Sequence, residues 1–260
     1  MTALPIFRAG RIAAAAFFAL VTVCSLPLSG HADEMDAPVD AAERAKIESV
    51  VRDYILANPE IIVDALKELE RREKVAADEK RSAVIAQLVP TLLADPMTPV
   101  VGNVDGDVVM VEFFDYQCGY CKRLFPDLKT AMAEDDGLKV VFAEYPILSP
   151  ASVVAARAAI AAKNQDKYWD FHVALMSHEG RLDEAVIMET ADSVGLDTDR
   201  LATDMKSEAV TAHLRGVQAM AQALGVTGTP AMVIGDQYVG GYVPLAHLQA
   251  LFAQTRDKAS

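Results

Sequence analysis

The stretch of sequence that decides the fold is VVMVEFFDYQCGYC, residues 108–121. Its first half, Val108–Phe114, is a continuous apolar run that contains one carboxylate, Glu112. An apolar run of this length is typical of a strand buried on both faces of a sheet. The stretch ends in Cys118-Gly119-Tyr120-Cys121, and the residues that follow, Lys122–Ala133, are predicted to form a helix. The sequence therefore predicts a strand, a loop and a helix, with two cysteines where the loop meets the helix.

The spacing of the two cysteines indicates redox chemistry. Residues three apart lie on one side of a helical turn, so the sulfurs of Cys118 and Cys121 are close enough to form a disulfide. Cys118 comes first, where free backbone N–H groups and the helix dipole stabilise a thiolate, and such cysteines titrate well below the ordinary value of about 8.5. We therefore expect Cys118 to be a nucleophile and Cys121 to stay a thiol until it attacks a mixed disulfide. A purely structural disulfide is the weaker interpretation, because closing so short a loop stabilises a fold little.

A zinc site is the other alternative for the two cysteines. Zinc in a structural site needs four ligands. The histidines outside the N-terminal segment show no ligand spacing: His172, His178, His213 and His247. We therefore predict no metal and no organic cofactor, and the Cys118–Cys121 disulfide is the redox group.

Residues 1–32 are typical of an export signal. Two arginines precede a largely apolar run, Ile12–Leu28, and Gly30-His31-Ala32 offers the small residues that a signal peptidase recognises. An uncleaved membrane anchor is the alternative, because the apolar run reaches the shortest length that spans a bilayer. We predict cleavage and export, which leaves Cys118 and Cys121 as the only cysteines of a mature protein in an oxidising compartment.

Composition and charge exclude several classes of protein. The chain has 260 residues, of which 52% are hydrophobic and 23% charged, which is typical of globular proteins rather than disordered or fibrous ones. Its formal net charge of −13 disfavours nucleic acid and anionic lipid as partners, because like charges repel. Three cysteines are too few for a small disulfide-stapled scaffold.

Residues 33–98 are predicted to form a helical arm ahead of the catalytic domain. Apolar side chains recur at helical spacing over Ile47–Ile55 and again over Ile61–Leu69, and Asn58-Pro59 separates the two stripes. An isolated helix is marginal in water, so the stripes must be covered, either by the catalytic domain or by the arms of other copies. Self-association through residues 41–90 is our preferred interpretation.

Residues 99–260 are predicted to form one mixed α/β domain. The expected order of elements is β-α-β, a helical insert at about 149–224, and β-β-α. Leu138–Tyr145 is the second strand, and it should run parallel to the first because a crossover helix joins them. The last elements are a hairpin and a helix, over Ala231–Ile234, Gln237–Val239 and Leu245–Thr255.

Two further features point to the same site. Pro230 opens an apolar strand. Proline has no backbone N–H, and the first position of a strand is one where this donor is not needed for pairing. If the Thr229–Pro230 bond is cis, the Thr229 backbone can pair with an extended substrate; an ordinary trans loop is the alternative. Glu112, if buried, would have a raised pKa and could exchange a proton with Cys121. The alternative for Glu112 is a side chain at the end of the strand that reaches solvent.

These motifs resemble the DsbA-type thiol–disulfide oxidoreductases of the bacterial periplasm. The similarity covers roughly Val104–Phe252 and implies a thioredoxin fold with a helical insertion, preceded by the α-helical arm. By this resemblance Cys118 is the nucleophile, Cys121 the resolving cysteine, Pro230 a cis-proline and Glu112 a buried acid/base.

The resemblance also implies partners and substrate contacts. We expect Gly119, Tyr120, Thr229 and Pro230 to contact substrate. The substrates would be exported proteins, a membrane redox partner would reset the cysteine pair, and the location would be the periplasm.

The arm from Glu43 to about Lys74 is similar to the N-terminal segment of the suppressor-of-copper-sensitivity C (ScsC) proteins. Some members of that subgroup are trimers with disulfide isomerase or reductase activity, so the resemblance favours a trimer.

The active-site motif departs from that of the DsbA oxidase in two places. Gly119-Tyr120 replaces Pro-His and Thr229 replaces a valine, and both changes make the site less oxidising if they stabilise the thiolate less. We therefore predict a protein disulfide oxidoreductase/isomerase that favours isomerisation or reduction. The alternatives are a dithiol oxidase of the DsbA type and an oligomeric chaperone-like or copper-binding protein whose redox pair is not essential.

Overall fold

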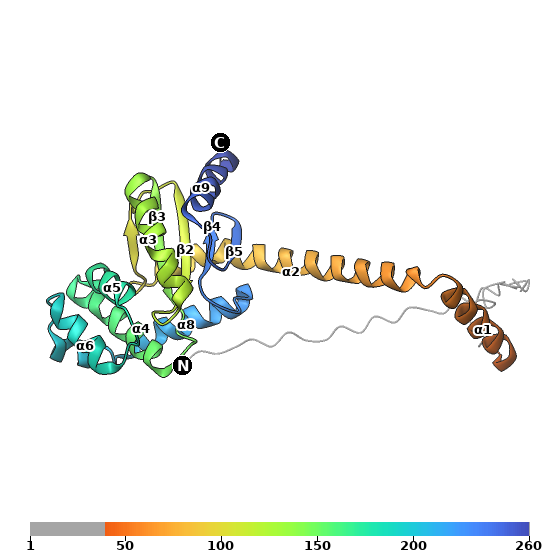
Figure 1. Cartoon of the computed structure of the whole chain (residues 1–260), viewed down its shortest axis with the longest axis horizontal. Coiled ribbons are helices and arrows are strands. Elements are labelled where there is room, and N and C mark those ends of the chain that lie inside the picture. The colour runs from red at the N-terminus through yellow and green to blue at the C-terminus, as the bar shows by residue number, and fades with distance from the viewer. Residues whose placement is uncertain (1–39, 260) are drawn as a thin grey trace, which may run out of the picture. The chain divides into compact units, whose positions relative to one another are not determined.

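The structure of the chain, a computed structural model, describes residues 40–259 (Figure 1). The predicted signal peptide, residues 1–32, lies outside this range. Within it, no helix combines the length and the hydropathy that a membrane span requires. By their contacts, the residues separate into two units, with the division after Val63.

The first unit holds α1 (Ala41–Ala57) and the first residues of α2 (Glu60–Ala94). Asp40 caps α1, because its Oδ1 accepts the backbone N–H groups of Ala42 and Glu43 at 2.8 Å each. The helix ends at Asn58, as predicted from Asn58-Pro59. None of the residues of α1 is buried, and five of its large apolar side chains are 49–72% exposed: Ile47, Val50, Val51, Tyr54 and Leu56.

The C-terminal part of α2 belongs to the second unit. Its buried residues Ile85, Leu88 and Leu92 pack in one cluster with residues of the central sheet. The chain therefore separates inside α2 and not near residue 98, where the sequence suggested a boundary. The reason is that the apolar residues near Pro90 pack on the sheet, and α2 continues through Pro90 to Ala94.

The second unit is built on a five-stranded sheet with the order β1-β3-β2-β4-β5. The strands are β1 (Val100–Gly102), β2 (Val108–Phe114), β3 (Leu138–Glu144), β4 (Ala231–Ile234) and β5 (Gln237–Gly240). β2 and β3 are parallel, as predicted, and the other neighbouring pairs are antiparallel. The edge strand β1 was not predicted, because three residues are too few to show a periodicity.

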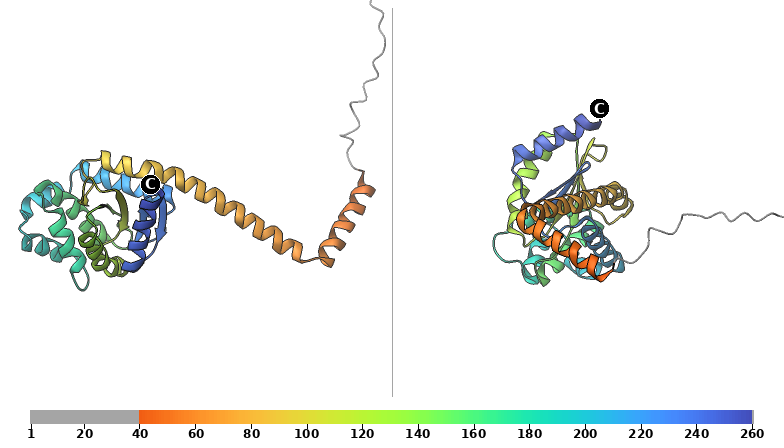
Figure 2. Two further views of the ribbon diagram at one scale, coloured as in Figure 1. Left: turned by 90° about the horizontal axis from the view of Figure 1, so that it is seen from above. Right: turned by 90° about the vertical axis from the view of Figure 1, so that its right-hand side faces the viewer.

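Helices cover both faces of this sheet. The element bounds are α3 (Gly119–Glu134), α4 (Pro150–Ala162), a 3-10 turn (Lys163–Gln165), α5 (Tyr168–Ser177), α6 (Glu184–Ser193), α7 (Thr198–Asp204), α8 (Glu208–Leu224) and α9 (Leu245–Ala259). On one face, Met110 and Phe114 of β2 pack with α3, α9 and the insert. On the other face, Val111 and Phe113 pack with α8 and the last turns of α2, which lie side by side (Figure 2). This is a thioredoxin fold with a helical insertion, and it confirms the predicted fold class.

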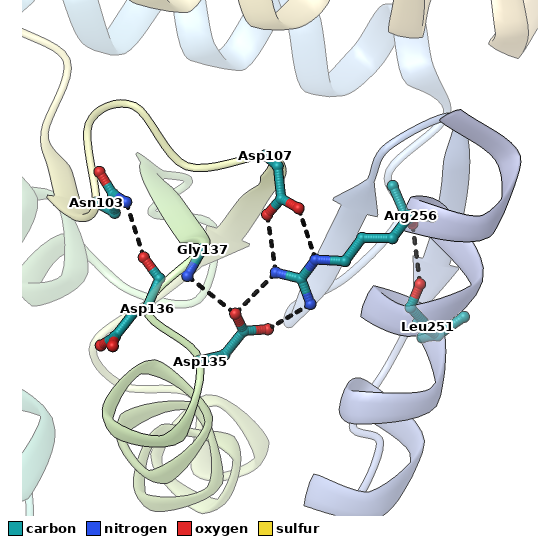
Figure 3. A network of polar contacts seen from close by, with 8 residues as sticks. Asn103, Asp107, Asp135, Asp136, Gly137, Leu251 and Arg256 are labelled. Carbon is teal, nitrogen blue, oxygen red and sulfur yellow. Dashed lines mark hydrogen bonds and ion pairs between the residues drawn. The ribbon is translucent and has the colours of Figure 1, made fainter. Parts of the chain in front are cut away.

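Arg256 of α9 joins the beginning of β2 to the end of α3 (Figure 3). Its Nε and Nη2 donate to the two carboxylate oxygens of Asp107 at 2.8 Å each. Its Nη1 and Nη2 donate to Asp135 at 2.9 and 2.7 Å. Asp135 also accepts the backbone N–H of Gly137, which leads into β3. One guanidinium thus ties three elements together at the end of the sheet away from the cysteines.

Replacing Arg256 with glutamine is expected to lower the melting temperature by about 2–4 °C, because charge-assisted bidentate bonds are lost. The matched control is Lys258→Gln, since Lys258 pairs with Asp236 at an exposed position of the same helix. Hydrogen bonds from Arg256 lower the pKa of Asp107 and of Asp135. The stability that these bonds contribute is therefore present above the ordinary carboxyl pKa and is lost as the pH falls through the lower folded-state values. Thermal unfolding of wild type, Arg256→Gln and Lys258→Gln at neutral and acid pH checks this. Equal melting temperatures of wild type and Arg256→Gln at neutral pH would contradict it.

Candidate active site

Cys118 lies where the loop after β2 meets α3. It is the N-cap of α3, and its Sγ accepts the backbone N–H of Cys121 at 3.4 Å. The same Sγ lies 3.2 Å from the carbonyl oxygen of Thr229. Cys118 is 6% exposed and Cys121 is fully buried, and no disulfide joins the two in this structure. An incoming sulfur can therefore reach only Cys118.

The two cysteines have opposite acidities. The pKa of the Cys118 thiol is lowered to about 6, mainly by the hydrogen bond from the Cys121 side chain, with smaller contributions from N–H groups of the first turn of α3. Burial raises the pKa of Cys121 far above its ordinary value, and the hydrogen bond to Cys118 and the charge of Glu112 raise it further. At neutral pH Cys118 is a thiolate and Cys121 a thiol, which is the state that nucleophilic attack followed by resolution requires.

Thr229 and Pro230 lie opposite the cysteines. The Thr229–Pro230 peptide bond is cis. Pro230 directly precedes β4, whose first residue, Ala231, pairs with Phe113 near the end of β2. The Thr229 carbonyl oxygen is thereby placed beside the Cys118 sulfur, where a polypeptide joined to that sulfur would meet the backbone of this loop.

Glu112 is buried in the middle of β2. It pairs with Phe142 of β3 on one side and with Met232 of β4 on the other, and it is 2% exposed. The interpretation of Glu112 as a strand-end side chain in solvent is therefore wrong. Burial raises its pKa to about 8, and the charge of Cys118 adds to this. Glu112 can hold a proton next to the cysteines while Cys118 is ionised.

Gly119 and Tyr120 lie at the surface above the sulfurs. Tyr120 is 61% exposed, and a side chain at Gly119 would meet no other group within 4 Å. The structure thus brings Cys118, Cys121 and Glu112 together, with the intervening pair open to solvent.

Asp115 is a site residue that the sequence analysis missed. This buried carboxylate accepts the N–H of Gln117 at 2.8 Å through Oδ1. Its Oδ2 accepts the N–H groups of Ile147 and Leu148 at 2.9 and 3.0 Å. Asp115 thus holds the loop that carries Cys118 against the loop that follows β3. The sequence shows the first contact as a local turn, but not the other two.

A second buried acid, Glu144, was also missed. It ends β3, and its Oε1 accepts the Tyr168 hydroxyl at 2.7 Å. The Tyr168 hydroxyl lies 3.4 Å from Nδ1 of His172, which also contacts the Tyr116 hydroxyl at 2.9 Å. Burial raises the pKa of Glu144 to about 8 and lowers that of His172 to about 3. The network is therefore neutral near pH 7 and lies under the loop that carries Cys118. A carboxylate inside the apolar run of β3 was the available signal.

Among residues 40–259, no group of three or more His, Cys, Asp or Glu side chains is arranged to hold a metal ion.

The comparisons with known proteins agree with this geometry. The family described as DSBA-like thioredoxin domain matches residues 109–253, and the family described as copper resistance protein ScsC N-terminal domain matches residues 43–76. A thioredoxin-like oxidoreductase from Silicibacter pomeroyi DSS-3 is 44% identical, with a TM-score of 0.62 over 64% of this chain and 96% of that one. A linker-deletion mutant of ScsC from Proteus mirabilis is 26% identical, with a TM-score of 0.65 over 86% of this chain and 99% of that one.

Curated relatives match over a smaller share of their own length. The Na(+)/H(+) antiporter NhaA 1 of Salinispora arenicola is 28% identical over 163 residues, which are 60% of this chain and 25% of that protein. The chain spans about a quarter of the length of the curated relatives it matches.

Replacing Glu144 with glutamine is expected to change how stability depends on pH. The folded-state pKa of about 8 exceeds that of an exposed glutamate. The stability that the protonated acid contributes is thus fully present below about pH 4.3 and is lost as the pH rises through about 8. Glutamine keeps an acceptor for Tyr168 and does not ionise. The melting temperature of Glu144→Gln, relative to wild type, should therefore rise by several degrees between about pH 5 and about pH 9.

The matched control is Glu189→Gln, because Glu189 is exposed on α6. The difference in melting temperature between Glu189→Gln and wild type should be the same at both pH values. A pH-independent difference for Glu144→Gln as well would show that the buried acid is not protonated in the folded state.

Proposed function

The chain belongs to the DSBA-like thioredoxin domain family, and from this premise we propose that it exchanges disulfides with exported proteins through Cys118 and Cys121. At the level of the family, the comparisons confirm the predicted resemblance and the enzyme class, a thiol–disulfide oxidoreductase. The substrates, the direction and the partners are part of the proposal.

The observation that carries the proposal is the placement of two sulfurs on one helical turn, with Cys118 as the N-cap and Cys121 fully buried. The Cys118 thiolate attacks a substrate disulfide, one substrate sulfur joins Cys118, and the other leaves as a thiolate. The charge on Cys118 disappears in this mixed disulfide, so the contribution of that charge to the raised pKa of Glu112 is lost. Glu112 can then give its own proton to the departing substrate thiolate, and as a carboxylate it can accept the Cys121 proton. The Cys121 thiolate attacks Cys118, which releases the substrate as a dithiol and leaves the Cys118–Cys121 disulfide.

The acidity of Cys118 supports isomerisation or reduction over oxidation. Its pKa of about 6 is set by Cys121 and the N-terminus of α3. That value is nearer to the value of about 7 in thioredoxin than to the value of about 3.5 in DsbA. A less stabilised thiolate favours the disulfide, which makes the pair less oxidising. We place this activity in the periplasm, reached through the signal at residues 1–32, with a membrane redox partner that resets the pair.

Copper binding is a weaker alternative. It rests on two soft thiolates, Cys118 and Cys121, and on the description of the family matched at residues 43–76. No third His, Cys, Asp or Glu side chain joins the two sulfurs in a group that could hold a metal ion, in the part of the chain that the structure describes.

Replacing Cys118 with serine should abolish insulin reduction and the refolding of scrambled ribonuclease, because no nucleophile remains. Circular dichroism of the variant should match wild type, since serine has the shape of cysteine. The wild-type pair, equilibrated in glutathione buffers, should show a reduction potential nearer to about −200 mV than to the about −120 mV of DsbA. Retained activity in Cys118→Ser would overturn the proposal, and a potential near that of DsbA would overturn only its direction.

We further propose self-association through the exposed part of residues 41–90, ahead of the buried Ile85, with a trimer as the preferred number. The support is the exposed apolar stripe of α1, in which Val50 is 68% and Tyr54 59% exposed, and the similarity of residues 43–76 to the ScsC N-terminal domain. Burying such side chains would favour association by about 1.5–3 kcal/mol each.

Light scattering on the mature protein tests this association. Wild type should have the mass of an oligomer, and Val50→Asp should shift it toward the monomer because a charge would lie in the apolar contact. Ser49→Asp is the matched control, since it adds the same charge on the opposite side of α1. A monomeric wild type, or equal effects of the two variants, would contradict the proposal.

A further inference from the structure

A groove of about 530 Å³ opens beside Cys118, between α3 and the loop that joins α5 to α6. Gln117 and Gly119, the two chain neighbours of Cys118, both line it. Its apolar lining includes the buried side chains of Phe125 and Met176. The groove is therefore continuous with the place where a mixed disulfide would form.

The wall of this groove is held by the residues that flank the two cysteines. Gln117 directly precedes Cys118, and its side chain donates to the Leu182 carbonyl at 2.9 Å and accepts the Leu182 N–H at 3.4 Å. Lys122 directly follows Cys121, and its Nζ donates to the carbonyl of His178. The loop at 178–183 is thus fixed at both ends to the active-site segment. Because this wall is already held in place, little conformational entropy would be lost from it when a ligand binds.

The rim of the groove carries two lysines, Lys122 and Lys129, seven residues apart on one side of α3. The Lys129 ammonium lies 5.0 Å from the centre of the Phe125 ring. Neither lysine takes part in an ion pair with any of residues 40–259. Glu179, on the opposite wall, is the acidic residue of the lining. The two lysines therefore give this rim a local positive charge on a chain whose net charge is −13.

We propose that this groove binds the segment next to the reacting cysteine of a partner protein and favours a segment with an apolar residue and a carboxylate. The inference rests on the proposed function. A chain joined to the Cys118 sulfur extends from it in two directions, and the groove takes the direction away from Thr229–Pro230. An extended chain advances about 3.3 Å per residue, so a few residues bring side chains over the groove. Phe125 and Met176 would bury the apolar side chain, and the lysines would pair with the carboxylate.

The groove predicts a preference for acidic peptides, whereas the overall charge of the chain predicts a preference for basic ones. A field from a net charge of −13 repels acidic peptides and attracts basic ones. A preference for acidic peptides would therefore have to come from the local lysines.

The test is the rate at which reduced full-length protein attacks short peptides whose single cysteine is a mixed disulfide with thionitrobenzoate. The Cys118 thiolate bonds to the peptide sulfur, and thionitrobenzoate leaves as a coloured thiolate. The peptides carry Phe and Glu, or Phe and Lys, on the N-terminal or the C-terminal side of the cysteine. For one side, the Glu peptide should react about 3–10 times faster than the Lys peptide, and Lys129→Glu should reverse this ratio. Lys129→Gln should give an intermediate ratio.

Lys206→Glu is the matched control, because Lys206 is exposed before α8 and the change in net charge is the same. It should leave the ratio as in wild type. The proposal is overturned if Lys peptides react faster with wild type, or if Lys129→Glu and Lys206→Glu have equal effects. Failure of every peptide to react would instead remove the proposed function on which the groove depends.

Discussion

The hydrogen bonds that Cys121 donates to the Cys118 sulfur are the interaction on which the active site depends. They require both cysteines on the first turn of α3, with Cys118 as the N-cap and Cys121 inside. The end of β2 brings the chain to this point, and the fully buried position of Cys121 keeps its proton in place. One local geometry therefore gives the two sulfurs the opposite acidities that the proposed nucleophile and resolving thiol need, and the sheet and its helices maintain the burial that separates these acidities.

Three buried carboxylic side chains lie in the core near this turn, and they differ in the hydrogen-bond donors that they meet. Asp115 accepts three backbone N–H groups, Glu144 accepts one tyrosine hydroxyl, and Oε1 of Glu112 has no hydrogen-bond partner among the described residues. Hydrogen-bond donors stabilise a carboxylate, and burial without them stabilises the acid. Asp115 holds two loops together through its three hydrogen bonds. Burial raises the pKa of Glu112, whose Oε1 has no donor among the described residues.

Much of the fold could be predicted because its signals are local. The apolar runs of β2 and β3, the cysteine spacing and the glycine that ends α8, Gly225 with a φ of 77°, each appear within a few residues of sequence. The contacts that escaped prediction join distant positions. Gln117 meets Leu182 across 65 residues, and Lys122 meets His178 across 56. Periodicity carries no information about such pairs. For the same reason, the sequence does not show that the apolar end of α2 packs on the sheet instead of belonging to the arm.

The packing of α2 explains how an arm can be attached without closing the site. Ile85, Leu88 and Leu92 lie on the sheet face opposite to the one that holds both cysteines. Arg81 adds a polar contact on the same side, because its Nε donates to the Leu224 carbonyl at 3.3 Å and its guanidinium lies over the ring of Tyr238. An element anchored on this face does not compete with a substrate for Cys118 or for the groove beside it. The residues that anchor α2 in the core and the exposed apolar residues at its beginning belong to one helix, Glu60–Ala94. The catalytic domain is thereby joined to the segment proposed to self-associate through a face that plays no part in the chemistry.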